Sequence, residues 1–197
     1  MEYPFEEYKE LLRQKLKESR YLHSIAVMER AVFLAECWGA DPSKAKTAGL
    51  LHDIMKNTDP KNQLIFLREF GIILKQEEKA AFPIWHSFSG ALYAEKVLGI
   101  TDQEIIDSIR YHTTGRANMT LLDKVIFMAD LTSSDRNYPD VDFVRELSEE
   151  NLDASLLYGI EFVIGDLLAK GNVLHPDTVG CYNWLVQQGV KRIWLEK

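Results

Sequence analysis

Apolar residues recur at steps of three and four positions over most of this sequence, and that spacing restricts what the chain can fold into. In the segment 23–38, for example, Ile25, Met28, Val32 and Ala35 follow it. Such a spacing places apolar side chains on one face of an α-helix, where they can be buried together. Alternating runs rich in β-branched residues, which are typical of strands, are few. The sequence therefore predicts an all-α fold, a single compact helical bundle.

Capping residues indicate where individual helices begin and end. Gly39 suits the C-terminal cap of the helix just described, and Asp41, which is followed by a proline, suits the start of the next helix. We expect this second helix to continue through Lys56 and to include the adjacent pair His52 and Asp53.

The remaining helices follow from the same spacing and from similar caps. Thr101 and Glu104 have the separation of a capping box, which predicts a helix that starts after Thr101. Further helices are predicted over residues 8–16, 59–71, 83–99, 120–130, 142–150, 152–171 and 175–190. Because neither a fixed-period repeat nor a low-complexity linker separates these helices, we expect residues 1–197 to form one domain.

The composition disfavours several classes of protein. With 46% hydrophobic residues the chain can bury a core, which argues against disorder. A formal net charge of -7 argues against binding to nucleic acid, which needs a basic surface. No apolar run approaches the roughly 20 residues that span a bilayer, and the acidic N-terminus does not resemble a signal peptide. We therefore expect a cytoplasmic protein that binds neither nucleic acid nor a membrane.

The two cysteines, Cys37 and Cys181, lie far apart in the sequence, and no CxxC spacing is present. This arrangement favours two buried free thiols over a disulfide framework or a zinc knuckle. A metal site without cysteine is also unlike the usual structural zinc cluster.

Four polar residues are predicted on helices beside apolar residues: His23, His52, Asp53 and Asp130. Asp130 lies four residues after Ile126, on a helical stripe that should face the core. A buried carboxylate is costly without a partner, whereas a metal ion supplies the counter-charge and accepts both imidazole nitrogen and carboxylate oxygen. The pattern therefore suits a divalent transition metal with coordination positions open to water and substrate. A hydrogen-bonded network of His and Asp inside a helical core is the alternative.

Five strings extend the pattern over nearly the whole chain. They are SRYLHSIAV, KAKTAGLLHDIMK, WHSFSGALYA, IRYHTTGRANMTLLDKVIFMAD and HPDTVGCYNWL. The first four carry, in order, His23, His52, Asp53, His86, His112 and Asp130. This order of residues on helices resembles the HD superfamily of metal-dependent phosphohydrolases. Within that superfamily the strings resemble the YqeK-type family of symmetrical bis(5'-nucleosyl)-tetraphosphatases.

The resemblance implies a specific activity and specific residues. It implies hydrolysis of diadenosine tetraphosphate to two ADP with a bound iron or similar divalent ion, and manganese or cobalt would suit the same donors. It implies metal ligands at His23, His52, Asp53 and Asp130. It implies nucleotide contacts from Arg20, Asp53, Lys56, His86, His112, Asp130, Arg136, His175 and Thr178.

Attack of metal-activated water on a phosphoanhydride is the reaction that we expect from such a site. Asp53 would hold the metal and orient the water, and Lys56 and Arg20 would reach the phosphates. His86 and His112 have two open roles. They form hydrogen bonds to bound phosphate, which the resemblance favours, or they capture a second metal ion with Asp53 as the bridge.

The sequence departs from the family pattern at two places. Related proteins commonly read Tyr-Ile-Glu-Pro after the aspartate that matches Asp130, whereas Ser133 and Ser134 stand here in place of Glu and Pro. No role is carried over to that glutamate position, and the contribution of this loop to substrate choice is open. Near the C-terminus, Tyr182 stands where an arginine is common.

Residues for the nucleoside ends of the substrate are indicated less sharply. His175 begins the last predicted helix, so the backbone amides near Thr178 could meet a phosphate or ribose, with an ordinary helix cap as the alternative. Trp85, Tyr111 and Tyr182 are the nearest aromatic candidates for base stacking, unless they only fill the core.

Three other functions are open on the sequence alone. An HD phosphohydrolase of a nucleoside monophosphate, a dNTP or a guanosine polyphosphate would share the metal ligands and differ in pocket length. A non-catalytic nucleotide-binding HD module would bind its ligand without turnover. A helical scaffold without metal would need its buried His and Asp residues only for stability. A homodimer is likewise open beside a monomer.

Overall fold

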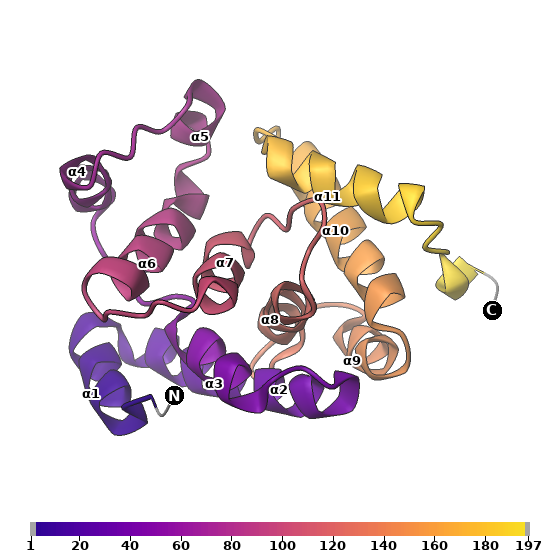
Figure 1. Cartoon of the computed structure of the whole chain (residues 1–197). Coiled ribbons are helices and arrows are strands. Elements are labelled where there is room, and N and C mark those ends of the chain that lie inside the picture. Colours follow the sequence, from indigo (N-terminus) through magenta and orange to yellow (C-terminus); the bar gives the residue numbers. More distant parts are fainter. Residues whose placement is uncertain (1–2, 196–197) are drawn as a thin grey trace.

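The computed structural model describes residues 3–195, and these form helices joined by short loops (Figure 1). The helices are α1 (Phe5–Lys15), α2 (Glu18–Trp38), α3 (Pro42–Leu51), α4 (Pro60–Glu69), α5 (Gln76–Ala80), η1 (Phe82–Ile84), α6 (Trp85–Lys96), α7 (Gln103–Tyr111), α8 (Leu121–Thr132), α9 (Val141–Glu150), α10 (Leu152–Ala169), α11 (Pro176–Gln187) and η2 (Ile193–Leu195), where η marks a 3-10 helix. Residues 3–195 contain no β-strand, which confirms the predicted all-α class. Residues 1–2 and 196–197 of the expected domain 1–197 lie outside the described residues.

The core lies where α2, α3, α7 and α8 pack against one another. Leu50, Ile109 and Ile126 are among its side chains that have no exposed surface. Gly49 permits a close approach of α3 to α2, because a Cβ atom at this position would lie only 3.0 Å from the Cα atom of Met28. The close approach brings the end of α3 next to the first turns of α2.

Several predicted caps are confirmed. Gly39 ends α2 in the left-handed region, with a φ of 76°. Asp41 accepts hydrogen bonds from the backbone amides two and three residues later, at the start of α3. Asp59, the first residue of the helix predicted over residues 59–71, does the same for the amide two residues later in α4. These caps satisfy amides that have no partner within their own helix.

The predicted capping box at Thr101 is wrong. Asp102 is the N-cap of α7, and its carboxylate accepts a hydrogen bond of 3.0 Å from the amide of Glu104. Because α7 begins at Gln103, the carboxylate of Asp102 faces the free amides of the first turn, whereas Thr101 is one position too early.

The second predicted helix ends earlier than its spacing indicated. α3 stops at Leu51 instead of continuing through Lys56, and residues 52–57 form tight turns. A hydrogen bond of 2.8 Å from the amide of Lys56 to the carbonyl of Asp53 belongs to these turns. The prediction that His52 and Asp53 lie inside a helix is therefore wrong. In this segment backbone hydrogen bonds between residues three apart replace the bonds between residues four apart that define an α-helix. Both side chains lie in a turn at the end of α3.

A second, smaller cluster of apolar side chains lies beside the core and comprises Leu67, Leu74, Trp85, Phe88 and Leu92. It holds α4 and the segment before α5 against α6. α5 has no counterpart among the predicted helices. It is five residues long and has no buried residue, so it leaves no apolar periodicity in the sequence.

The two cysteines differ in their surroundings. Cys181 on α11 is buried as predicted, and burial raises the pKa of its thiol to about 12. Cys37 on α2 is exposed, so the prediction of a buried thiol is wrong for this residue. Cys37 follows the buried Ala35 by two positions, which is more than half a turn around the helix.

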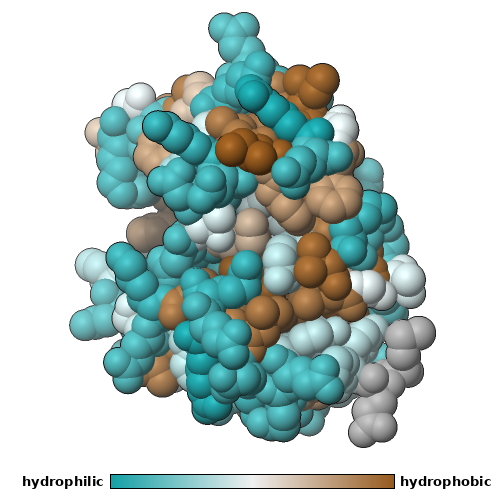
Figure 2. Space-filling view, turned by 90° about the vertical axis from the view of Figure 1, so that its left-hand side faces the viewer, coloured by the Kyte–Doolittle hydropathy of each residue, from teal (hydrophilic) through white to brown (hydrophobic). Residues whose placement is uncertain are grey.

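Figure 2 shows the face of the molecule that includes α1 and α4. Hydrophilic side chains cover most of this face, and apolar side chains are exposed between them. Ile65 on α4 is 53% exposed and Ile73, after the end of α4, is 81% exposed.

In the described part of the chain, every helix is too short or too polar to cross a membrane.

Candidate metal and nucleotide site

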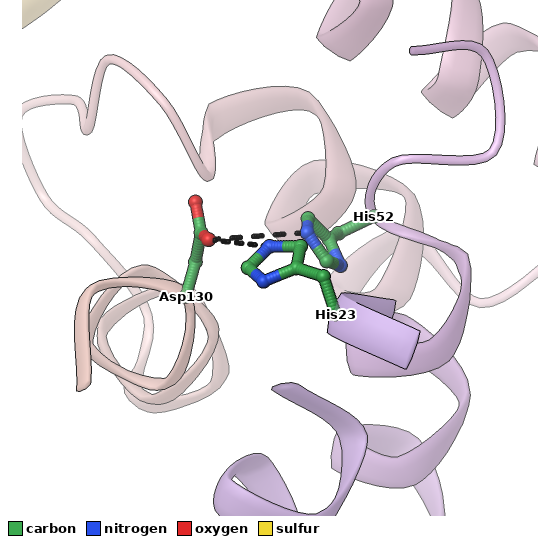
Figure 3. A group of neighbouring side chains, drawn as sticks. All are labelled: His23, His52 and Asp130. Carbon is green, nitrogen blue, oxygen red and sulfur yellow. Dashed lines mark ion pairs between the residues drawn. The ribbon is translucent and has the colours of Figure 1, made fainter. Parts of the chain in front are cut away.

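His23, His52 and Asp130 come together from three separate elements (Figure 3). His23 lies on α2, His52 directly follows α3, and Asp130 lies near the end of α8. The Nε2 atom of His23 is 3.0 Å from Oδ1 of Asp130, and Nε2 of His52 is 4.0 Å from the same oxygen. The packing of α2, α3 and α8 thus gathers three of the four predicted metal ligands.

Asp53, the fourth predicted ligand, lies among several imidazoles. Its Oδ2 atom is 3.4 Å from Nε2 of His52, and its Oδ1 atom is 3.1 Å from Nε2 of His86 and 3.6 Å from Nε2 of His112. The Nε2 atoms of His86 and His112 are themselves 3.2 Å apart. Donor atoms of His52, Asp53 and His112 therefore form a second close group beside the one in Figure 3.

In each of these four imidazoles the Nδ1 atom is already engaged. Nδ1 of His52, His86 and His112 lies 2.7 Å from the backbone carbonyl oxygen three residues earlier. Nδ1 of His23 instead lies 2.8 Å from the Oδ2 atom of Asp135. Because a carbonyl or carboxylate oxygen can only accept, each Nδ1 carries the proton and each Nε2 presents a lone pair to the site.

The donor atoms of this group fit a divalent cation. Nε2 of His23, Nε2 of His52 and Oδ1 of Asp53 are buried without a hydrogen-bond partner. Buried polar atoms without partners are rare and costly, and lone pairs that face one another repel. A cation removes both costs. Nε2 of His23 and Oδ1 of Asp130, which are 3.0 Å apart, are close enough to bind one ion together.

Three cationic side chains lie against the two carboxylates. Nη1 of Arg20 is 2.8 Å from Oδ2 of Asp53, and Nζ of Lys56 is 3.9 Å from Oδ1 of the same residue. Arg136 donates through Nε to the backbone carbonyl of Asp130 at 2.7 Å and through Nη2 to its carboxylate. The three cations are each about one third exposed, with fractions of 30%, 33% and 34%. The three cations therefore lie where the His and Asp side chains border the solvent, and there they would attract an anion.

A pocket of about 160 Å³ is lined mostly by apolar side chains and includes Pro83, whose carbonyl accepts a hydrogen bond from Nδ1 of His86. Thr113, which directly follows His112, lines the pocket together with His175 and Thr178. Nδ1 of His175 accepts a hydrogen bond of 3.1 Å from the amide of Asp177, so His175 is also the cap of α11. Nε2 of His175 and Oγ1 of Thr113 are buried without partners. The pocket thus offers polar atoms to a ligand within an apolar lining.

The HD domain family matches residues 20–135, which include all four predicted metal ligands. The chain belongs to the HD-domain family. It is 40% identical to the symmetrical bis(5'-nucleosyl)-tetraphosphatase of Bacillus subtilis (strain 168) over 181 residues, 89% of this chain and 94% of the relative. It is 34% identical to the enzyme of the same name in Staphylococcus aureus (strain NCTC 8325 / PS 47) over 184 residues, 91% of this chain and 93% of the relative. The family resemblance noted in the sequence is therefore confirmed.

A solved structure has the same fold as this HD protein. It is the crystal structure of a predicted HD superfamily hydrolase involved in NAD metabolism from Clostridium acetobutylicum, with a TM-score of 0.92 and 34% sequence identity. The similarity covers 95% of this chain and 100% of the other chain. Membership of the HD-domain family implies dependence on a divalent metal ion, and the His and Asp groups described above are its candidate ligands.

The four histidines and two aspartates described above (His23, His52, His86, His112, Asp53 and Asp130) are called the HD site below. Both aspartates of the HD site are ionised. Burial raises the pKa of Asp53, but the imidazoles of His52, His112 and His86 around its carboxylate outweigh burial and hold the pKa well below its ordinary value. Burial likewise raises the pKa of Asp130, and the nearby imidazole of His23 and the charge of Arg136 outweigh it, so that this pKa is also well below the ordinary value. Ionised carboxylates are the form that binds a cation.

Lys56 and His86 contact each other on the side of the HD site that bears Oδ1 of Asp53. Nζ of Lys56 is 3.1 Å from Nε2 of His86. Burial lowers the pKa of Lys56, although the charge of Asp53 raises it. Burial lowers the pKa of His86 to about 4. His86 is therefore neutral near pH 7, and its Nε2 atom accepts a hydrogen bond from the ammonium group of Lys56.

Two residues beside the HD site were not predicted from the sequence as site residues. Asp135 contacts His23, and the hydroxyl of Ser133 donates a hydrogen bond of 2.7 Å to Oδ1 of Asp135. No local pattern marks Asp135, because it lies in a polar loop and its partner is 112 positions away in the sequence. The departure from the family pattern at Ser133 was the one signal that pointed to this loop.

The aromatic candidates for base stacking lie in different places. Trp85 is buried in the smaller apolar cluster and donates a hydrogen bond of 2.7 Å to the carbonyl of Glu78. Tyr182 lines a separate groove, and its hydroxyl accepts a hydrogen bond from Arg192. Phe82, which the sequence did not single out, lines the pocket and is 60% exposed. Phe82 is therefore, unlike Trp85 and Tyr182, an aromatic side chain in the lining of this pocket.

Proposed function

We propose that this HD protein hydrolyses diadenosine tetraphosphate symmetrically and releases two ADP. The observation that carries the proposal is the convergence of four imidazole Nε2 atoms on the carboxylates of Asp53 and Asp130, with three cations beside them. The similarity to symmetrical tetraphosphatases over about nine tenths of the chain supports the same substrate. The formal net charge of -7 supports free nucleotides over nucleic acid as the anionic ligand.

The proposed metal ligands are His23, His52, Asp53 and Asp130. Their unpartnered buried donor atoms support this set. Iron is the proposed ion, and manganese and cobalt also suit imidazole and carboxylate donors. When bound, such an ion supplies activation of water and polarisation of a phosphoryl oxygen.

The proposed catalytic side chains are Asp53 and Lys56. Asp53 stays ionised, so its carboxylate accepts a hydrogen bond from the attacking water and orients it. Lys56, Arg20 and Arg136 donate to phosphoryl oxygens, where negative charge increases in the transition state. His86, which is neutral, keeps the ammonium group of Lys56 in place. ADP is a good leaving group, so strong acid catalysis is not required.

The pocket of about 160 Å³ is the proposed binding place for one nucleoside end of the substrate. Its apolar lining suits a purine, and the unpartnered polar atoms of Thr113 and His175 suit a ribose or phosphate. Thr178 lies in the first turn of α11, where backbone amides have no helical partner. Nε2 of His112 lies 3.6 Å from Oδ1 of Asp53, and the next residue, Thr113, lines the pocket, which supports a contact of His112 to phosphate.

We further propose that the protein acts in the cytoplasm and that the whole chain works as one domain. The main core cluster supports the second point, because it runs from Tyr8 on α1 to Leu185 on α11. Both a monomer and a homodimer are compatible with this arrangement.

The experiment is to purify the protein without oxygen, measure its metal content, and separate the nucleotides formed from diadenosine tetraphosphate. We expect one bound ion per chain and ADP as the sole product. Asp53→Ala should lose both, whereas Asp166→Ala, on the exposed part of α10, should lose neither. Formation of ATP and AMP would contradict symmetrical cleavage, and a wild-type protein that binds metal without turnover would contradict the proposed reaction.

A further inference from the structure

His23 differs from the other three imidazoles of the site in what holds its Nδ1 atom. His52 and His112 are C-terminal caps, and His86 is the second residue of α6, so each reaches a backbone carbonyl three residues earlier. His23 lies inside α2, and the carbonyl three residues before it is that of Arg20. This carbonyl already accepts a hydrogen bond from the hydroxyl of Ser24, the residue after His23. The Nδ1 proton of His23 goes to the side chain of Asp135 instead, at 2.8 Å.

Asp135 is itself held at both of its oxygens. Oδ2 accepts from His23, and Oδ1 accepts from the hydroxyl of Ser133 at 2.7 Å. The carboxylate is therefore fixed although its side chain is 41% exposed. Ser133 occupies the position where the family resemblance leads one to expect a glutamate, and in this chain it orients a carboxylate two residues later.

Arg145 on α9 fixes the backbone of the loop that carries Asp135. Its guanidinium group donates to the carbonyl of Thr132 at 3.1 Å, to that of Ser133 at 2.8 Å and to that of Arg136 at 2.9 Å. These three carbonyls flank Asp135 on both sides. One side chain therefore fixes the loop on either side of the carboxylate that faces His23.

We propose that Asp135 is a positioning residue that fixes the tautomer and the ring orientation of His23, so that Nε2 faces the metal position. The proposal rests on the metal centre of the proposed function and adds a residue to it. When a histidine binds a metal through one ring nitrogen, a carboxylate that accepts a hydrogen bond from the other nitrogen fixes the proton there and increases the basicity of the metal-binding nitrogen. Loss of such a carboxylate typically lowers metal affinity about 10–100-fold. The role is carried by a side chain at His23 and by the backbone at the other three histidines.

The first test measures metal affinity. Mn²⁺ is titrated into the full-length wild-type protein and into Asp135→Ala, Asp135→Asn and Ser133→Ala, with Asp166→Ala as a control that changes an exposed carboxylate elsewhere. We expect Asp135→Ala to weaken Mn²⁺ binding about 10–100-fold. Asp135→Asn keeps an acceptor oxygen without the charge and should restore part of the affinity. Ser133→Ala should weaken binding less than Asp135→Ala.

The second test reads the tautomer of His23 directly, which a general loss of stability would not change. The imidazole nitrogen resonances of the metal-free, ¹⁵N-histidine-labelled protein are recorded, with His23→Gln for assignment. We expect the proton of His23 on Nδ1 in the wild type and on Nε2, or shared between the nitrogens, in Asp135→Ala. An unchanged tautomer together with unchanged Mn²⁺ affinity in Asp135→Ala would overturn the proposal.

A third variant separates this proposal from the metal centre on which it rests. His52→Ala should abolish Mn²⁺ binding whatever the role of Asp135. If His52→Ala loses Mn²⁺ and Asp135→Ala binds it as the wild type does, the metal centre stands and the role of Asp135 is wrong. If the wild type binds no Mn²⁺ or other divalent ion, both the metal centre and the role of Asp135 are wrong.

Discussion

The guanidinium group of Arg20 lies 2.8 Å from the carboxylate of Asp53, across the contact between α2 and the turn that follows α3. Only one oxygen of Asp53 takes part, because the other faces His86 and His112. Arg20 therefore brings a fixed positive charge to the carboxylate that we propose as both metal ligand and water-orienting group. Its side chain is 30% exposed, so it can also meet the phosphates of a substrate.

Replacement of this cation should slow the reaction more than it affects the fold. We expect Arg20→Gln to lower kcat/KM for diadenosine tetraphosphate about 100-fold, because a charged donor to the phosphoryl oxygens is lost. Arg20→Lys, which keeps the charge, should recover part of the loss. Arg13→Gln is the matched control, since the contacts of Arg13 are an exposed 3.6 Å ion pair with Glu10 on α1 and a cation–π contact with the ring of Tyr21, neither of which involves a proposed metal ligand. Steady-state rates within twofold of the wild type for Arg20→Gln would contradict this role.

The number of bound ions should not depend on His86. We expect His86→Gln to keep one ion per chain and to lower kcat, because Lys56 loses the imidazole that holds its ammonium group at 3.1 Å. Metal analysis of the dialysed protein and initial rates at saturating substrate measure the two effects. His52→Gln, which removes a proposed ligand, should lose the ion. A fall from two ions to one in His86→Gln would instead indicate a second metal bridged by Asp53.

His175 should make the protein less stable in mild acid. Burial lowers the pKa of His175, and the charge of Arg110 acts in the same direction, although Asp177 and Glu78 oppose them. The unfolded chain, in which His has a pKa of about 6.5, therefore binds this proton more readily than the folded chain does. The free energy of unfolding should fall as pH drops below about 6.5 toward the lower folded pKa, by at most about 1.4 kcal/mol per pH unit for one group.

His175→Asn provides the comparison for this pH effect, because asparagine keeps a cap acceptor for the amide of Asp177 and does not titrate. Urea denaturation at pH 7.5 and pH 5.5 gives the free energy of unfolding of both proteins. We expect a smaller decrease between the two pH values in the variant than in the wild type. Equal decreases would show that His175 does not contribute to the acid sensitivity.

Gly115 should tolerate no side chain. Its φ is 61°, in the left-handed region, and a Cβ atom there would lie 2.8 Å from Sγ of Cys181 and 3.2 Å from Cδ1 of Ile160. We expect Gly115→Ala to lower the free energy of unfolding by about 2–4 kcal/mol, from backbone strain and overpacking together. Gly165→Ala is the control, since that glycine lies within α10 with open space around its Cβ position, and it should be neutral or stabilising. Thermal denaturation that ranks the two variants in the reverse order would contradict the expected strain at Gly115.

Local signals in the sequence were sufficient for most of the helices, except for α5 and the end of α3. The spacing of apolar residues depends on the 3.6-residue turn, which is a property of a single segment, so the all-α class could be read without knowledge of packing. Caps such as Gly39 and Asp41 act on amides and carbonyls within a few residues and were equally readable. The prediction at Thr101 was wrong because two neighbouring residues, Thr101 and Asp102, can both cap, and only the exact first residue of α7 decides between them.

The sequence by itself determined the fold class, most of the helices and the HD pattern of candidate ligands, because each of these is encoded in residues close together or in a recognisable order. Only the tertiary structure decided that α3 ends before His52, that the Nε2 atoms of four histidines face the two aspartates, and that Asp135 is the partner of His23. Apart from the end of α3, these relationships mostly join residues far apart in the sequence, such as Asp53 with His86, and His23 with Asp135, which are 112 positions apart. Such distances are fixed by how whole helices pack, and helix packing leaves no trace in the order of neighbouring residues.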